Sequence, residues 1–435
     1  MKKSSIQNSE IFTAAMSNKA QPKKHPSGYL NQPIAFVTAL FLSPIWLLNV
    51  VLSFTQGKPA ISKNVRLDAL GRKVSISIFS SGLMRSSAVV LDILNKRLAF
   101  VGASLNHTLS YQVQQEILTA YRVPSAITSL HDVHAMTGLA EFNKDELMLK
   151  QLNGSALMMI GILLKYLILK LWFGRSKLRT HKQVAVFGIT LDNIKMKQAV
   201  NWVVKQQPLD KFNSYASNNR TQVGYFVNAH SINTLAKNNE FKHCLNNADA
   251  LFADGSGMRV ATRTAGFHLV ANLNGTDMLP KICQAAAAQN KSIFLLGSKD
   301  QVAQKAAANL QKLYPSLHIS GTHHGFFGAD DEEKSMKMVE EINQSNTDVL
   351  LVGFGSPQQE LWCQRYAQHL NCKTVLAVGG LFDYYSGQIK RAPLFMRELG
   401  LEWIWRLMQE PKAKFSRYVI GTPEFLIRTF ILRQV

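Results

Sequence analysis

Hydrophobic runs that end in polar or glycine-rich turns recur through the second half of the chain. Six of them lie in FVNAH, ALFAD, SIFLLGS, HISGTHHGFFG, VLLVGFGSP and TVLAVGGLFDYY, and VAVFGIT before them predicts one further short strand. Segments with helical periodicity separate several of these runs, for example at 193–205, 301–313 and 333–344. Alternation of strands and helices predicts a mostly parallel sheet with right-handed crossovers and flanking helices.

The stretch 226–277 is the centre of this pattern and reads as strand, helix, strand, turn, helix. Asn228 follows the apolar run 224–227, and Asp254 follows the apolar run 250–253. Ligands of open α/β sheets bind outside the carboxyl ends of the strands, so we expect both side chains to face a crevice. The alternative for Asp254 is a plain turn residue, because Asp-Gly is a common turn pair.

The first half of the chain contains two long apolar stretches. Residues 33–54 are almost uncharged and just long enough to span a bilayer, with Pro44 in the middle. This run predicts either a spanning helix or a re-entrant hairpin, and the lysines on both sides of it favour the hairpin slightly. The stretch 157–173 is interrupted by Lys165 and Lys170, which is more typical of an interfacial helix.

These patterns divide the chain into five predicted parts. The predicted fold class is α/β, a mostly parallel Rossmann-like sheet with flanking helices and a C-terminal helical appendage, preceded by a membrane-associated α+β domain. The parts are a disordered polar leader at 1–32, the membrane-associated domain at 33–173, a basic linker at 174–182 that contacts anionic headgroups, the α/β domain at 183–390 and a basic aromatic appendage at 391–435.

Composition narrows the class of partner. The 435 residues carry a formal net charge of +21, which favours an anionic membrane surface or a phosphorylated substrate. We expect no nucleic acid, because neither a Cys/His zinc spacing nor an RNA-binding signature is present. The 4 cysteines are scattered, as in proteins of a reducing cytosol.

The segment 352–360 is the second candidate for substrate binding. Gly353 and Gly355 follow a strand and let the backbone approach a ligand, and the helix that begins after them offers N–H groups to a diphosphate. Gln358 stands where a dinucleotide fingerprint needs glycine, so a nicotinamide cofactor is not expected. Gln359 and Glu360 are predicted to hydrogen-bond a sugar or base, with N-terminal capping by Glu360 as the alternative.

The segment after Lys390 mixes aromatic side chains with cations. Arginine forks bind phosphates bidentately, and Trp and Tyr beside them favour an interface. The alternative is a solvated amphipathic helix with extended cations. The cations are Arg391, Arg397, Arg406, Lys412, Lys414, Arg417, Arg428 and Arg433.

Taken together, the motifs from about residue 182 to the end resemble the WecG/TagA/CpsF glycosyltransferases (glycosyltransferase family 26). The ordered motifs are Asn228, Ala253-Asp254-Gly255, Asn274-Gly275-x-Asp277, Gly325-Phe326-Phe327, Gly353-x-Gly355-x-Pro357-x-Gln359-Glu360, Arg391-Ala392-Pro393, Gly400-Leu401-Glu402-Trp403 and Glu410-Pro411.

The resemblance implies an activity and a place. It implies transfer of a sugar, such as N-acetylmannosamine or a related hexose, from a UDP-sugar to a polyprenyl-diphosphate-linked sugar, with inversion and without a metal or other cofactor. It also implies surface-polysaccharide synthesis at the cytoplasmic face of the bacterial inner membrane, with residues 33–54 as the anchor, and self-association of the chain.

The resemblance also assigns expected roles to residues. Asp254 is the expected general base, and Arg391, Arg406 and Arg417 are expected at the diphosphate. The remaining expected substrate contacts are Asn228, Asn274, Gly275, Asp277, Gly353, Gly355, Gln359 and Glu360. Phe226, Asn272 and Gln358 replace the Thr, Arg and Lys that are usual in the family, which leaves the donor and acceptor sugars open.

The first half, over about 33–173, is similar to bacterial phosphoglycosyl transferases that load a sugar phosphate onto polyprenol phosphate. Their catalytic Asp-Glu pair aligns with Arg85-Ser86, neither of which is a carboxylate, so we expect a degenerate relative that retains membrane docking. Two alternatives stay open: a bifunctional enzyme, which would release UMP with undecaprenyl phosphate as sole acceptor, and a non-catalytic scaffold, which would not bind UDP.

Overall fold

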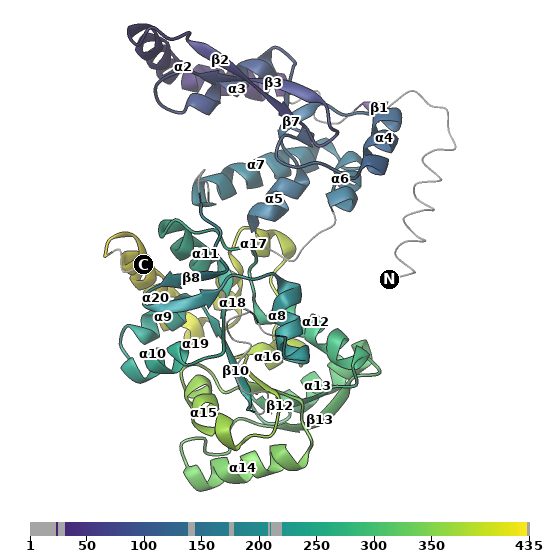
Figure 1. Cartoon of the computed structure of the whole chain (residues 1–435), viewed down its shortest axis with the longest axis vertical. Coiled ribbons are helices and arrows are strands. Elements are labelled where there is room, and N and C mark those ends of the chain that lie inside the picture. The colour runs from purple at the N-terminus through teal and green to yellow at the C-terminus, as the bar shows by residue number, and fades with distance from the viewer. Residues whose placement is uncertain are drawn as a thin grey trace. The chain divides into compact units, whose positions relative to one another are not determined.

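The computed structural model describes residues 23–24, 31–137, 144–173, 178–207, 209 and 220–432 (Figure 1). The chain separates into two compact units, the first within 1–136 and 141–172 and the second within 137–140 and 173–435. Nearly all of the predicted leader, residues 174–177 of the predicted linker, and Arg433 lie outside the described residues.

A six-stranded parallel sheet forms the centre of the second unit, in the spatial order β11-β10-β15-β14-β12-β13. All six predicted strands are present, so the predicted sheet is confirmed. Four strands, β11, β12, β14 and β15, are buried along their whole length, as parallel strands covered on both faces are. The strands are β10 Gln222–Val227, β11 Ala250–Ala253, β12 Ser292–Gly297, β13 His318–His323, β14 Val349–Gly353 and β15 Thr374–Ala377.

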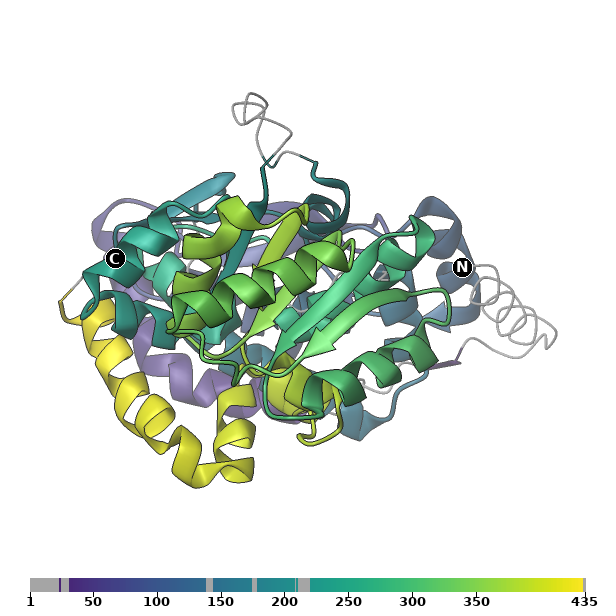
Figure 2. The ribbon, with the colours of Figure 1, turned by 90° about the horizontal axis from the view of Figure 1, so that it is seen from below.

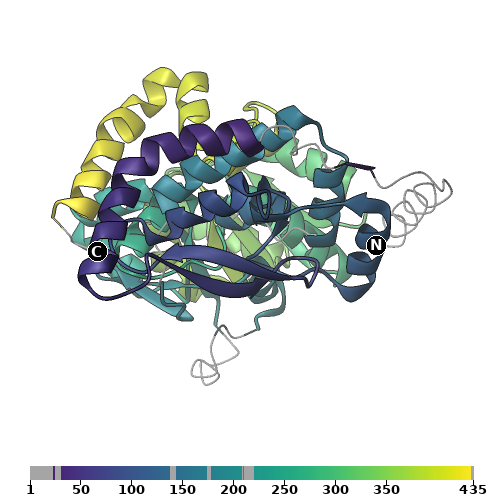
Figure 3. The same ribbon diagram turned by 90° about the horizontal axis from the view of Figure 1, so that it is seen from above.

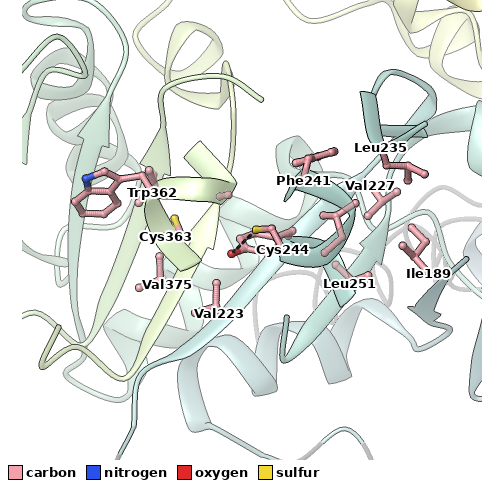
Figure 4. Packing of buried hydrophobic residues seen from close by; sticks show 14 of the residues in the cluster. Ile189, Val223, Val227, Leu235, Phe241, Cys244, Leu251, Trp362, Cys363 and Val375 are labelled. Atoms are coloured by element: carbon pink, nitrogen blue, oxygen red, sulfur yellow. Dashed lines mark hydrogen bonds between the residues drawn. The ribbon is translucent and has the colours of Figure 1, made fainter. Parts of the chain in front are cut away.

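Helices cover both faces of this sheet with two separate hydrophobic cores. One core includes Phe241, Trp362 and Phe425, and part of it is drawn in Figure 4. The other includes Trp202, Met278 and Phe382. The helices are α8 Met196–Lys205, α9 Ala229–Leu235, α10 Asn239–Asn246, α11 Gly255–Thr264, α12 Gly275–Ala288, α13 Val302–Leu313, α14 Glu332–Gln344, α15 Gln358–Tyr366, η4 Ala367–His369 and α16 Leu381–Tyr385.

The VAVFGIT segment corrects one prediction. It is not a single strand of the main sheet but an antiparallel hairpin of β8 (Gln183–Val186) and β9 (Ile189–Asp192). The two residues of its turn, Phe187 and Gly188, have φ values of 53° and 75°. Positive φ at both central residues fits the right-handed twist of a tight hairpin, and glycine adopts such a φ without steric cost.

The C-terminal appendage is helical, as predicted, and its last helix packs into the sheet domain. Phe425 is only 1% exposed and belongs to the same hydrophobic core as the sheet. Asn233 of α9 donates to the backbone carbonyl of Gly421 at 2.7 Å. Figure 2 shows the appendage helices, in yellow, along the border of the unit. They are α17 Leu394–Glu398, α18 Glu402–Gln409, α19 Pro411–Phe415, η5 Ser416–Ile420 and α20 Gly421–Phe430.

The first unit combines small sheets with helices. A hairpin pairs β2 with β3, and β7 lies between β4 and β5 as their parallel partner. The strands are β1 Lys23–Lys24, β2 Ile61–Leu67, β3 Lys73–Phe79, β4 Ala99–Val101, β5 Ala103–Ser104, β6 Tyr121–Arg122 and β7 Ser125–Thr128. The helices are α2 Asn31–Thr55, η2 Arg85–Ala88, α3 Val89–Leu94, α4 Tyr111–Ala120, α5 Leu130–Thr137, α6 Lys144–Leu152 and α7 Ala156–Phe173.

Helix α2 turns its polar side toward the protein and its apolar side outward. Asn49 is fully buried and exchanges two hydrogen bonds with the backbone of Leu83, at 2.7 and 2.8 Å. Phe41 and Phe54, in contrast, are 79% and 85% exposed. A soluble helix shows the reverse arrangement, so this surface indicates association with a membrane.

Helix α2 continues through Pro44 as one helix, which is drawn in dark purple in Figure 3. Pro44 has no N–H to donate to a carbonyl of the preceding turn. The Ser43 hydroxyl donates to the carbonyl of Leu40 at 2.8 Å and so satisfies an acceptor in that turn. Among the described residues, α2 is the helix long and apolar enough to cross a bilayer. Its mean hydropathy of 2.1 and its length of 25 residues meet that requirement.

Removal of residues 1–177 tests the independence of the second unit. We expect the remaining chain to fold, because both hydrophobic cores of the sheet consist of its own residues, and to leave the membrane fraction. Circular dichroism and fractionation of lysates by ultracentrifugation measure the two outcomes, with full-length protein as the control. Pelleting of the folded fragment with membranes would show instead that the appendage suffices for docking.

Candidate active site

Asn228 and Asp254 meet at the carboxyl edge of the sheet. Strands β10 and β11 are parallel neighbours, and their last paired residues are Val227 and Ala253. The residues that follow these two, Asn228 and Asp254, therefore lie beside each other. The Asn228 amide nitrogen donates to Oδ2 of Asp254 at 3.5 Å, so the structure brings these two predicted residues together.

The orientation of Asn228 is fixed by its second role as the N-cap of α9. Its Oδ1 accepts hydrogen bonds from the backbone N–H groups of His230 and Ser231, at 3.0 and 3.2 Å. Asparagine is favoured at this position because its short side chain satisfies donors that the first helical turn leaves open. With the oxygen occupied in this way, the amide nitrogen is directed at Asp254.

Asp254 stands at the N-terminus of α11 but makes no capping hydrogen bond there. The N–H of Gly255 bonds to Oδ1 of Asn272 at 2.8 Å instead, so the Asp254 carboxylate is not used as a helix cap. Burial, followed by the negative charge of Glu402, raises the pKa of Asp254 to about 6, although Asn228 opposes this shift. A carboxylate with that pKa is mostly ionised at pH 7 and is a stronger base than an exposed aspartate.

Asn274 and Asp277 form a second cluster at the start of α12. Asn274 caps this helix through the N–H of Asp277, and its amide nitrogen donates to Oδ2 of Asp277, both at 2.8 Å. Arg391 approaches the other oxygen of Asp277 at 2.7 Å and Glu402 at 3.6 Å. Burial raises the pKa of Asp277, but the hydrogen bond and charge of Arg391 outweigh this and hold it below its ordinary value. A Cβ at Gly275 would lie at ordinary contact distance from the ring of Phe226.

The other two predicted arginines differ in what surrounds them. Arg406 is buried between carboxylates, with Nε 2.7 Å from Glu410 and Nη2 3.4 Å from Asp383, and its guanidinium lies over the ring of Tyr384. Arg417 lies over the ring of Tyr418 and has no ion-pair partner among the described residues; its buried Nε also lacks a hydrogen-bond partner there.

The charge of Arg417, in the appendage, acts on His230 and Asp254. Burial, and after it the positive charge of Arg417, lower the pKa of His230 to about 4, so this ring is neutral at pH 7. The same charge favours the ionised form of Asp254. The positive charge of Arg417 thus acts on both a neutral histidine and a carboxylate.

The loop at 353–360 is arranged differently from the prediction. Gln359 is 4% exposed, and its Oε1 accepts the backbone N–H groups of Gly355 and Gly379 at 3.2 and 2.9 Å. Its amide nitrogen donates to the buried carboxylate of Glu360 at 2.8 Å. The side chain of Gln359 therefore ties the loops after β14 and β15 together.

The glycines of this loop serve two purposes. A Cβ at Gly353 would lie 2.6 Å from the carbonyl oxygen of Gly379, so the close approach is to protein backbone. A Cβ at Gly355 would meet nothing within 4 Å, but its φ of +98° disfavours a side chain. The space beside Gly355 is therefore open.

Sequence reasoning missed two of the carboxylates that contact the arginines, Glu402 and Asp383. Glu402 lies beside Arg391 and raises the pKa of Asp254, and Asp383 accepts from Ser298 at 2.7 Å while it faces Arg406. Each stands in a segment rich in glycine and aromatic residues, close in sequence to an arginine, which was the available signal. A cavity of about 340 Å³ with Lys205, Lys291 and Lys373 in its wall lies at the opposite, amino-terminal edge of the sheet, away from every predicted site residue.

Comparison with known proteins finds relatives of this unit. Residues 184–435 match the family described as "Glycosyl transferase WecG/TagA/CpsF family". A Staphylococcus aureus (strain MRSA252) protein named N-acetylglucosaminyldiphosphoundecaprenol N-acetyl-beta-D-mannosaminyltransferase is 27% identical over 228 residues, 52% of this chain and 84% of the relative. The protein of that name from strain MW2 is 27% identical over 232 residues, 53% of this chain and 86% of the relative.

Substitution of Arg406 by methionine tests whether this arginine supports the fold. We expect Arg406→Met to lower the free energy of unfolding by about 2 kcal/mol, because it leaves the carboxylates of Asp383 and Glu410 without their cation. For a domain of this size that corresponds to a fall in melting temperature of about 4–8 °C, measured by thermal unfolding of the full chain in detergent. The control is Lys337→Met, whose partner Glu333 is exposed. Equal melting temperatures for the two variants would contradict the structural role.

Proposed function

Because the chain belongs to the WecG/TagA/CpsF glycosyltransferase family, we propose that it moves an N-acetylmannosamine-type sugar from a UDP-sugar to a polyprenyl-diphosphate-linked sugar. The observation that carries the mechanism is the Asp254 carboxylate beside Asn228 at the carboxyl edge of the sheet. The names of the S. aureus relatives support an N-acetylglucosamine-diphosphoundecaprenol acceptor. The polymer made would belong to the cell surface.

Asp254 acts as the general base in this scheme. A sugar hydroxyl is a weak nucleophile, and a carboxylate within hydrogen-bond distance removes its proton as the new glycosidic bond forms. The acceptor oxygen attacks the anomeric carbon from the side opposite the leaving UDP, which inverts the configuration. Asn228 is a positioning residue, since its amide nitrogen orients Oδ2 of Asp254.

Arg417 stabilises the leaving diphosphate in the same scheme. Charge develops on the UDP oxygens as the bond to the sugar breaks, and a fixed cation in a partly buried site lowers the energy of that state. Arg391 and Arg406 are ion-paired with carboxylates, whereas Arg417 has no such pair among the described residues. Donors from Arg417 take the place of a divalent metal here, so the transfer step is metal-independent.

The lipid acceptor places this reaction at a membrane, and we propose the cytoplasmic face. The outward apolar surface of α2 supports anchoring, and the net charge of +21 supports attraction to anionic headgroups. A UDP-sugar is made and consumed in the cytoplasm, which places the sheet domain on that side. Holding the enzyme in the plane of its lipid substrate raises the effective concentration of the acceptor.

Substitution of Asp254 by asparagine tests the base. We expect Asp254→Asn to lower kcat by about 100-fold or more, because the amide keeps the shape but cannot accept the proton. UDP release by full-length protein in detergent, with a short-chain polyprenyl-diphosphate N-acetylglucosamine acceptor and UDP-N-acetylmannosamine, measures this.

The pH profile of the native chain provides a second measure of the base. The pKa of Asp254 lies at about 6, and the reaction needs the ionised form. The ratio kcat/KM should therefore fall as pH drops through that value.

The matched control for the Asp254→Asn substitution is Asp331→Asn, at an exposed helix cap. Full activity of Asp254→Asn would sink the proposal.

Substitution of Arg417 by glutamine tests the diphosphate contact. We expect Arg417→Gln to lower kcat/KM for the UDP-sugar by about 100-fold and to weaken UDP binding, because the leaving group loses its cation. The control is Arg428→Gln, further along the appendage, where Arg428 pairs with Glu424. Unchanged kinetics for Arg417→Gln, with lost activity for Arg428→Gln, would assign the role to another arginine.

A further inference from the structure

A group of metal-ligand side chains lies in the first unit, far along the chain from Asp254. Strands β5 and β7 are parallel neighbours, and each is followed by part of the group. His107 comes three residues after β5. His131 and Asp132 stand in the first turn of α5, which begins two residues after β7. Two neighbouring parallel strands thus bring together residues 24 positions apart in sequence.

The geometry of the three side chains suits one cation. One ring nitrogen of each histidine and one carboxylate oxygen of Asp132 all lie within 4.8 Å of one another. Nδ1 of His107 is 3.5 Å from Oδ1 of Asp132, and the two imidazole rings are 4.2 Å apart between centroids. Ligand atoms of a tetrahedral Zn²⁺ ion, at about 2.0–2.2 Å from the metal, are about 3.3–3.6 Å apart. A small inward movement would therefore complete three metal–ligand bonds.

One ring nitrogen of each histidine, Nδ1, is buried without a hydrogen bond among the described residues, although Nδ1 of His107 faces the Asp132 carboxylate at 3.5 Å. The His107 side chain is 6% exposed. A buried polar atom without a partner destabilises the fold, so such atoms need an explanation. A bound cation supplies the missing partner for both rings at once.

The surrounding residues hold the carboxylate in a fixed position. Ser129 donates its backbone N–H and its hydroxyl to Oδ2 of Asp132, at 2.9 and 3.0 Å, and so leaves Oδ1 for the side of His107. Gln151 accepts from the N–H of Leu130 at 2.7 Å and donates to the carbonyl of Gly102 at 3.1 Å. It thereby links the start of α5 to the turn between β4 and β5. Known metal sites have such outer hydrogen bonds, which orient their ligands.

We propose that His107, His131 and Asp132 bind one divalent transition-metal ion, with Zn²⁺ the best match. Two imidazole nitrogens and one carboxylate oxygen suit Zn²⁺, whereas Mg²⁺ and Ca²⁺ prefer oxygen ligands alone. Three protein ligands leave a fourth position for water or an anionic oxygen. The site belongs to the first unit and takes no part in the proposed sugar transfer in the second.

Metal content and affinity of the full-length protein in detergent test this site, with an affinity tag that contains no histidine. After treatment with a chelator and addition of Zn²⁺, we expect about one ion per chain by mass spectrometry of the metal. Co²⁺ in its place should give the visible absorption bands of a four- or five-coordinate ion. Titration of His107→Gln and Asp132→Asn should show affinity for Zn²⁺ weakened by at least roughly 10-fold.

The controls separate this site from adventitious binding by surface histidines. His243→Gln, an exposed histidine of the second unit, should bind Zn²⁺ as the native chain does. Mg²⁺ added in excess should not displace Zn²⁺. The proposal is overturned if the chelated native chain takes up no stoichiometric Zn²⁺. It is equally overturned if His107→Gln and Asp132→Asn, with native circular dichroism, keep the native affinity.

Discussion

The hydrogen bond between Asn228 and Asp254 exists because β10 and β11 run parallel and end in register. Val227 pairs with Ala253, so the first residue beyond each strand lies at the same height on the same edge. Each of these residues also begins a helix, and the appendage packs on both helices. A shift of one strand by a single residue would separate the amide from the carboxylate and turn alternate side chains to the wrong face. The whole site therefore depends on this one pairing.

The sequence predicted the sheet and the position of Asp254, because buried parallel strands read as short apolar runs and their ends as polar turns. It could not predict what the arginines contact. Arg391 pairs with Asp277, more than 100 positions earlier, and Arg406 pairs with Asp383, more than 20 positions earlier. Such pairs follow only from tertiary contacts. The contacts of Gln359 could not be predicted either, because its amide oxygen bonds to the backbone of two separate loops. Spacing within the sequence likewise gave no sign of His107 beside His131.

The sheet domain and helix α2 of the first unit bury opposite kinds of side chain. The sheet domain hides apolar side chains on both faces of six strands. Helix α2 instead hides Asn49 and exposes Phe41 and Phe54, which is stable only where the surroundings are apolar. Ser43 supplies a donor close to Pro44, in a helix with little water available to do so. Membrane association thus follows from which side chains α2 keeps inside rather than from its hydrophobicity alone.

The burial of Phe425 limits how far the appendage can move. It lies in the last helix, yet it is 1% exposed within the core that the sheet shares with α9, α10 and α15. A helix anchored by a core side chain does not swing out as a separate lid, because release would expose that ring to water. Its backbone amides should exchange with deuterium only in openings that also loosen the sheet, as one cooperative unit. Arg417, a few residues earlier, is thereby held in place before any substrate arrives.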